Sequence, residues 1–166
     1  MKNHNFLVIL VGVCGTGKSA AGQKLAQRLE VPFFNAEKLP AFNGLPDGKL
    51  PQDVNLEKWL ISIKELIAKQ STLKGCVISC SVLKKEQRMM LAANIDHELD
   101  WVFMSGSYEY VAQRVEQMED HDRPASLLKT DFENLEIPKR ALTVDITYSE
   151  QEIVDTILKY LARKYG

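Results

Sequence analysis

Eight consecutive residues near the start of the chain constrain its fold more than any other feature. Residues 12–19 read Gly-Val-Cys-Gly-Thr-Gly-Lys-Ser and match the pattern G-x-x-x-x-G-K-[ST]. A continuous apolar run, Phe6–Val11, precedes them, and apolar residues at helical spacing follow. A buried strand, a glycine-rich loop and an amphipathic helix in this order are the context of a phosphate-binding loop. The alternative, a glycine turn that binds nothing, would need all three to coincide by chance.

Each residue type in this loop has a physical reason. Glycines let the backbone curl so that successive N–H groups point at a phosphate, and the helix N-terminus adds partial positive charge. We expect Lys18 to bridge the β- and γ-phosphates of ATP and the Ser19 hydroxyl to bind Mg²⁺. The thiol of Cys14 is expected to be incidental, because the loop contacts phosphate through its backbone. The candidate nucleotide-binding residues of the loop are Gly12, Val13, Cys14, Gly15, Thr16, Gly17, Lys18 and Ser19.

The rest of the chain alternates between strand-like runs and helical stripes. The strand-like runs are residues 31–34, 76–80, 101–104 and 142–146, and the clearest helical stripes are 59–67, 108–118 and 149–161. Ser149, with Glu152 three residues later, forms a capping box at the start of the last helix. Repeated strand–helix units predict a parallel sheet with helices on both faces, and 166 residues suffice for one such α/β domain.

Two stretches interrupt this alternation. Residues 35–55 contain several prolines and glycines, and residues 119–125 are polar and include Pro124. The first is predicted to be a loop, and the second either a loop or a mobile flap. Ligands of open α/β sheets bind beyond the carboxyl ends of the strands, so loops that leave those ends are where a substrate would be held.

Composition excludes several classes of protein. The 21 Lys and Arg against 22 Asp and Glu give a net charge of −1, which argues against coating a nucleic acid. The longest apolar run is far shorter than the roughly 20 residues that span a bilayer, and no cleavage site for secretion follows it. The three cysteines have no zinc-ligand spacing, and Cys76 and Cys80 are too far apart along one strand to form a disulfide. Three free thiols indicate the cytoplasm.

Beyond the phosphate loop the sequence resembles the gluconate kinase family of small P-loop sugar-acid kinases. Cys80–Lys85, followed by Arg88, is similar to the family's C-S-A-L-K-x-x-Y-R block. Pro51–Asp53 and Trp59-Leu60 resemble P-L-N-D-x-D-R-x-P-W-L. Further blocks of the family are matched by residues 103–106, Arg114-Val115, His121, Leu127-Leu128, Phe132, Leu135-Glu136 and Pro138.

The resemblance implies a P-loop NTPase fold and an activity. The fold would have three α/β/α layers, a five-stranded parallel sheet in the order 2-3-1-4-5 and a lid over roughly residues 115–137. The activity would be transfer of a phosphoryl group from ATP, with Mg²⁺, to a hydroxyl of a small sugar acid in carbohydrate metabolism. The expected partner is this small-molecule acceptor, and a homodimer is one assembly that we consider.

The resemblance also implies roles for single residues. Glu37 would orient the acceptor hydroxyl, unless it is a solvated loop acid. Arg88 and Lys84 would bind the acceptor's carboxylate, unless they form a solvated helix face. His121 would contact substrate or nucleotide from the lid, or be a surface histidine. We expect one of two lid-region cations, Arg114 and Arg123, to meet the γ-phosphate. Lys85 is expected to be solvated, and Trp59 and Trp101 to lie in the core.

The chain also departs from the family's pattern. The family has D-G-D-x-x-H after the second strand, where this chain has Asn35-Ala36-Glu37 and then Pro40. Two family arginines are replaced by Leu56 and Met118. Arg123-Pro124 is similar to the R-P-L-L lid of shikimate kinases and could replace the second arginine.

The resemblance and the departures from it together lead to three hypotheses about function. The first is a gluconate-kinase-like enzyme, and the second is the same fold acting on shikimate or another small alcohol. The third is a nucleotide-binding module that has lost catalysis.

Overall fold

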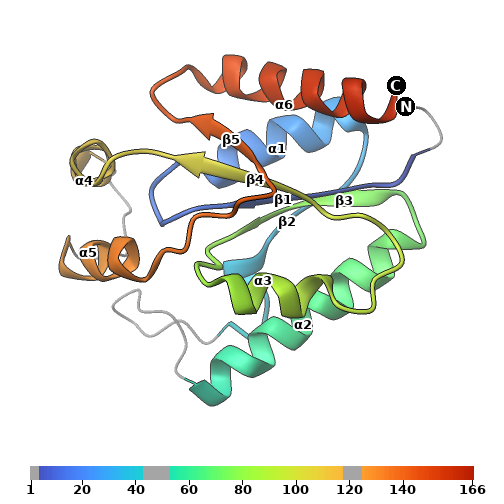
Figure 1. The fold of residues 1–166 in the computed structure, drawn as a ribbon, viewed down its shortest axis with the longest axis horizontal. Helices are drawn as coiled ribbons and strands as arrows, with labels where there is room; N and C mark the ends of the chain where they lie inside the picture. The colour runs from blue at the N-terminus through green and yellow to red at the C-terminus, as the bar shows by residue number, and fades with distance from the viewer. Residues whose placement is uncertain (1–3, 43–52, 118–124) are drawn as a thin grey trace.

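Five parallel strands form one sheet in the order β2-β3-β1-β4-β5, as predicted (Figure 1). The computed structural model describes residues 4–42, 53–117 and 125–166. The strands are β1 Phe6–Val11, β2 Phe33–Asn35, β3 Gly75–Cys80, β4 Asp100–Ser105 and β5 Leu142–Asp145. The helices are α1 Lys18–Leu29, the 3₁₀ turn η1 Ala36–Lys38, α2 Asp53–Ser71, α3 Lys85–Ala92, α4 Tyr108–Gln117, α5 Ala125–Asn134 and α6 Glu150–Tyr165.

The central strand β1 is buried on both faces, because its side chains alternate between two cores. Phe6, Val8 and Leu10 pack with residues of α1 and α6 on one face of the sheet. The residues between them pack with α2 and α3 on the other face. Figure 1 shows the two resulting helical layers above and below the sheet. A run of six apolar residues is what a strand covered on both sides requires.

The second strand begins later than its apolar run suggests. The sequence predicted residues 31–34, but β2 spans Phe33–Asn35. The N–H of Val31 donates to the carbonyl of Ala26 at the end of α1, at 3.0 Å, and is therefore unavailable to the sheet. Pro32 has no N–H to donate, although its carbonyl accepts a hydrogen bond from Val77 N at 3.0 Å.

The capping box of the last helix is confirmed. The Ser149 hydroxyl accepts from the N–H of Glu152 at 3.1 Å, and the Glu152 carboxylate accepts from the N–H of Ser149 at 3.2 Å. Two N–H groups that the helix itself cannot satisfy are thereby bonded. The cysteines Cys14, Cys76 and Cys80 are free, as predicted.

A charged cluster lies at the amino ends of the strands. The fully buried carboxylate of Asp100 accepts hydrogen bonds from Lys164 Nζ and from the Tyr165 hydroxyl, each at 2.7 Å. Burial would lower the pKa of Lys164, but its hydrogen bonds with Asp100 and Glu98 outweigh that effect and raise the pKa. His4 stacks on the Tyr165 ring at 3.7 Å between centroids. This cluster ties β4 to the end of α6.

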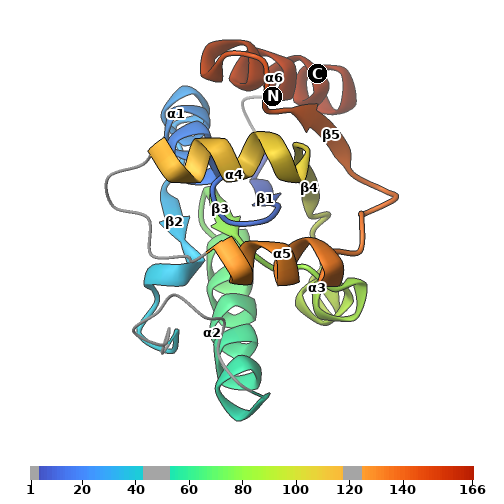
Figure 2. The ribbon, with the colours of Figure 1, turned by 90° about the vertical axis from the view of Figure 1, so that its left-hand side faces the viewer.

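The opposite edge of the sheet, where the strands have their carboxyl ends, carries the phosphate loop. Figure 2 looks onto this edge, and α4 and α5 cross in front of it. The predicted flap, residues 119–125, lies almost entirely outside the described residues, since α4 ends at Gln117 and α5 begins at Ala125. None of the described helices is long and apolar enough to cross a membrane.

Candidate active site

The phosphate loop joins the end of β1 to the start of α1. Gly15 and Gly17 have φ values of 89° and 87°, which L side chains rarely adopt. Gly17 is the N-cap of α1 and supplies no side-chain cap, so the first N–H groups of the helix are left for a ligand. Lys18 is only 7% exposed, and its Nζ donates to the carbonyl of Val13 at 2.8 Å. The ammonium group is thus held inside the loop, where a phosphate could replace the carbonyl as its partner.

Helix α4 packs directly on this loop. A Cβ placed on Gly15 would collide with Val115, and one placed on Gly17 would lie 2.7 Å from Nη2 of Arg114. The guanidinium of Arg114 therefore lies against the last glycine before Lys18. Of the two lid-region cations, Arg114 reaches the phosphate loop, whereas Arg123 lies outside the described residues.

Three neutral polar side chains from three elements meet at Ser19. Its Oγ lies 3.3 Å from the Ser79 hydroxyl on β3 and accepts from Nδ2 of Asn35, at the end of β2, at 3.1 Å. Magnesium in kinases is bound by few protein oxygens together with phosphates and water, and this hydroxyl-rich site fits that donor set. The described residues contain no group of three or more His, Cys, Asp or Glu that could hold a metal by themselves.

Glu37 lies in the turn η1, directly after β2, and its carboxylate points back into the protein. The turn is capped by Asn35, whose side-chain oxygen accepts from the N–H of Glu37 at 3.0 Å. Oε1 of Glu37 accepts from the N–H of Ser81 at 3.0 Å. Oε2 is buried and has no hydrogen-bond partner among the described residues. The carboxylate is therefore not a solvated loop acid, and an orphaned buried oxygen at a sheet edge indicates a ligand site.

A tryptophan fixes the turn that carries Glu37. Trp59 of α2 is 1% exposed, and its Nε1 donates to the carbonyl of Ala36 at 2.7 Å. Its burial confirms the prediction that it is a core residue, but the hydrogen bond was not foreseen. The sequence pattern marked Trp59 only as part of an apolar stripe, and an indole N–H that must find a partner when buried was the available signal.

Lys84 and Arg88 lie four residues apart around the start of α3, as predicted, but in different environments. Lys84 is half-buried at the N-cap of α3, where its backbone N–H donates to Oε1 of Gln87 at 3.2 Å. Arg88 is 7% exposed and donates to the carbonyls of Leu83, at 3.1 Å, and Glu136, at 2.6 Å. Burial lowers the pKa of Arg88, while the nearby carboxylate of Glu136 raises it.

The guanidinium of Arg88 forms its hydrogen bonds with backbone carbonyls of the protein itself. They join the segment after β3 to the segment after α5, and the N–H of Glu136 adds a bond to Leu83 O at 2.9 Å. This geometry suits a positioning residue better than a ligand for a substrate carboxylate. Lys84 is the cation of this pair whose charged end stays available, because its side chain makes no hydrogen bond or ion pair with a described residue. The remaining predicted residue, His121, lies outside the described part of the chain.

Comparisons with known proteins show which family the chain resembles in sequence and fold. The sequence model of the family described as "Shikimate kinase" matches residues 14–161. A gluconokinase of Gluconobacter oxydans (strain 621H) is 32% identical, over 96% of this chain and 90% of that protein. The thermoresistant gluconokinase of Escherichia coli (strain K12) is 28% identical, over 97% of both chains.

A solved structure supports the same relationship. The crystal structure of a gluconokinase from Sinorhizobium meliloti 1021 superposes with a TM-score of 0.82 at 32% identity, covering 96% of this chain and 93% of that one. Sequence and fold therefore agree over nearly the whole chain: it belongs to the gluconokinase family of small-molecule kinases and also matches the shikimate kinase family model.

Proposed function

We propose that this chain transfers the γ-phosphoryl group of ATP to a hydroxyl of gluconate or a closely related sugar acid. One observation carries the proposal: the carboxylate of Glu37 is held by the Ser81 N–H with its second oxygen buried and unpartnered among the described residues. It lies at the edge of the sheet that also carries the phosphate loop. A carboxylate so placed is suited to accept the proton of an acceptor hydroxyl.

Each residue then has a definite part in the transfer. The acceptor oxygen attacks the γ-phosphorus, the bond from that phosphorus to the bridging oxygen breaks, and the acceptor's proton passes to Oε2 of Glu37. Lys18 and the N–H groups of the loop stabilise the charge on the phosphates, with Arg114 beside Gly17. Bound Mg²⁺ would neutralise phosphate charge, and Ser19 is the residue that would hold it. Lys84 would bind the carboxylate of the sugar acid.

The proposal is tested with purified protein, ATP, Mg²⁺ and a panel of acceptors that includes gluconate and shikimate. We expect ADP release with gluconate, and a rate lowered about 10²- to 10⁴-fold by Glu37→Gln, which keeps an oxygen for Ser81 N–H but removes the base. Affinity for ATP should not change. Glu57→Gln, an exposed acid on α2, is the matched control and should keep the full rate. ADP release from no member of the panel would refute the proposal.

Shikimate is the second candidate acceptor, because the family model that matches residues 14–161 is described by that activity. The two acceptors are separated by thermal unfolding in the presence of a nucleotide, since only a true acceptor should raise the melting temperature further. If a nucleotide binds but neither acceptor does, the chain is a nucleotide-binding module without catalysis. We place the protein in the cytoplasm, because Cys14, Cys76 and Cys80 are all free thiols.

A further inference from the structure

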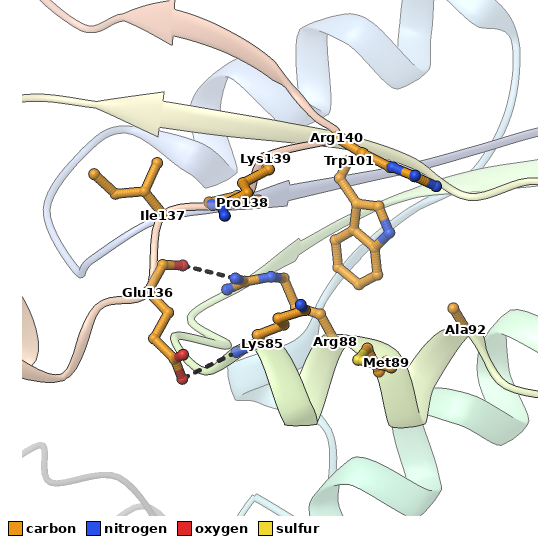
Figure 3. A pocket seen from close by; sticks show the side chains of 10 residues that line it. All are labelled: Lys85, Arg88, Met89, Ala92, Trp101, Glu136, Ile137, Pro138, Lys139 and Arg140. Carbon is orange, nitrogen blue, oxygen red and sulfur yellow. Dashed lines mark hydrogen bonds between the residues drawn. The ribbon is translucent and has the colours of Figure 1, made fainter.

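A cavity of about 840 Å³ opens beneath β4, away from the phosphate loop. It lies between α3 and the segment that leads from α5 to β5, with the Trp101 indole between them (Figure 3). Neither Glu37 nor any residue of Gly12–Ser19 is part of its wall. Of the described residues predicted for the transfer site, Arg88 alone lines the cavity, and its guanidinium is bonded to backbone carbonyls. We therefore treat the cavity as distinct from the site proposed for phosphoryl transfer.

The wall of the cavity is strongly cationic. It contains Lys85, Arg88, Lys139 and Arg140, and Glu136 is the one acid among its lining residues. The carboxylate of Glu136 accepts a hydrogen bond from the backbone N–H of Lys85, and the guanidinium of Arg88 donates to backbone carbonyls. The side chains of Lys85, Lys139 and Arg140 are exposed and form no hydrogen bond or ion pair with a described residue. Three cations around one concave surface attract an anion with several acceptor oxygens.

The same cavity also exposes apolar surface. Met89 is 61% exposed and Ile137 is 65% exposed, and both line it. Trp101 was expected to be a core residue, but it is only partly buried and forms part of the wall. Met89 lies near the Trp101 indole, whereas Ile137 lines the other end of the cavity (Figure 3). An indole face with a thioether near it favours a flat, weakly polar ring.

We propose that this cavity is a second binding site, for a small organic phosphate that carries an aromatic ring. Lys85, Lys139 and Arg140 would supply the positive charge that attracts the phosphate, and the ring would lie against Trp101. Nucleoside monophosphates and simple aryl phosphates share this chemistry. The site needs no Mg²⁺ and no phosphate loop, and it does not depend on which acceptor the kinase uses.

The probe for the test is phenyl phosphate, with inorganic phosphate and AMP as the other arms, titrated into the full-length protein by calorimetry. We expect phenyl phosphate to bind, and inorganic phosphate to bind about tenfold more weakly because it has no ring. AMP should match phenyl phosphate if the site accepts a nucleoside, and AMP that fails to bind restricts the site to smaller aryl phosphates. Tryptophan fluorescence should change on binding and stay constant in Trp101→Phe, because Trp59 is buried at 1% exposure.

Matched variants locate the binding. The double variant Lys139→Gln with Arg140→Gln should weaken phenyl phosphate binding about tenfold or more. Lys74→Gln with Lys159→Gln removes the same charge from exposed positions outside the cavity and should change it less than about twofold. Lys18→Met should leave the affinity unchanged, whatever happens to kinase activity.

Three results would overturn the proposal. The first is equal phenyl phosphate affinity in wild type and the Lys139→Gln/Arg140→Gln variant. The second is loss of binding in Lys18→Met, which would place the phosphate in the loop. The third is a dimer, seen by sedimentation, that Met89→Gln with Ile137→Gln dissociates, because the cavity would then be covered by a second copy of the chain.

Discussion

The two edges of the sheet treat their charged groups in opposite ways. At the amino edge, the buried carboxylate of Asp100 is fully engaged by Lys164 and Tyr165. At the carboxyl edge, Glu37 leaves one buried oxygen without a partner among the described residues, and Lys18 is bonded to a carbonyl of its own loop. A charged group whose hydrogen bonds are all made within the protein stabilises the fold. A charged group that lacks a hydrogen-bond partner, or whose partner a ligand can replace, is suited to binding. The comparison teaches that burial of a charge does not reveal its role, but the completeness of its hydrogen bonds does.

After Glu37→Gln, the largest effect that would test this contrast is expected from a change at Lys18. In Lys18→Met we expect the rate of phosphoryl transfer to fall about 10²- to 10³-fold, because a cation that meets the transferring phosphate is lost. The free energy of unfolding should change by no more than about 1 kcal/mol, the worth of one hydrogen bond to Val13. Lys24→Met, at an exposed position of the same helix, is the control and should keep the rate. A much larger loss in the free energy of unfolding would instead show that Lys18 has a structural role.

The converse change is made at the amino edge. Asp100→Asn should lower the free energy of unfolding by about 2 kcal/mol, less than the 3–5 kcal/mol of a fully buried pair, because Lys164 keeps Glu98 at 2.8 Å. Urea denaturation measures this, and the kinase rate of the folded protein should be unchanged. Asp155→Asn, whose partner Arg28 is 3.6 Å away on the surface, should cost less than about 1 kcal/mol. Similar losses in both variants would contradict the distinction between the edges.

A smaller effect checks that position at the carboxyl edge is not enough to make a residue functional. Ser149 follows β5 there, but its hydroxyl is saturated by the capping box. Ser149→Ala should lower the free energy of unfolding by about 1 kcal/mol, and Ser149→Asp should restore most of it. Neither variant should alter the rate of ADP release. A change in that rate would show that complete hydrogen bonding of a side chain does not indicate a purely structural role.

The smallest expected effect concerns the neutral residue that replaces a family carboxylate. Asn35→Asp should lower the Mg²⁺ concentration for half-maximal ADP release a few-fold, because a carboxylate beside Ser19 attracts the cation. The gain is limited because aspartate cannot donate to the Ser19 hydroxyl as Asn35 does. Direct titration of Mg²⁺ against the ADP-bound protein should give the same shift. Asn94→Asp, an exposed change elsewhere, should give none.

The sequence was sufficient to predict the features that are encoded by residues close together in the chain. The phosphate loop and the capping box at Ser149 rest on residues close together in the chain, whereas the order of the strands was implied by the resemblance to gluconate kinases, since β1 pairs with residues as distant as Gly75 and Asp100. Arg88 and Trp101 were harder, because their surroundings come from distant segments. Arg88 meets a carbonyl 48 residues away, and no local pattern contains that contact. The apolar stripe around Trp101 could not reveal that one side of β4 is only partly covered.

Glu37 lies between these cases. Its place after a strand was enough to nominate it, but its burial depends on the Ser81 N–H, which lies 44 residues further along the chain. The same applies to the meeting of Asn35, Ser19 and Ser79, which come from three elements. Residue type and position predict candidates, and the pairing of distant segments decides which candidates share a site.

The indole of Trp59 has a consequence for redesign of such kinases. Its bond to the Ala36 carbonyl couples the turn of Glu37 to a helix of 19 residues. A graft over residues 36–38 that changed the backbone conformation of this turn would move the Ala36 carbonyl away from the indole and leave a deeply buried N–H without an acceptor, at a cost of about 1–3 kcal/mol. A graft that reshapes the turn would therefore have to change the helix at Trp59 as well.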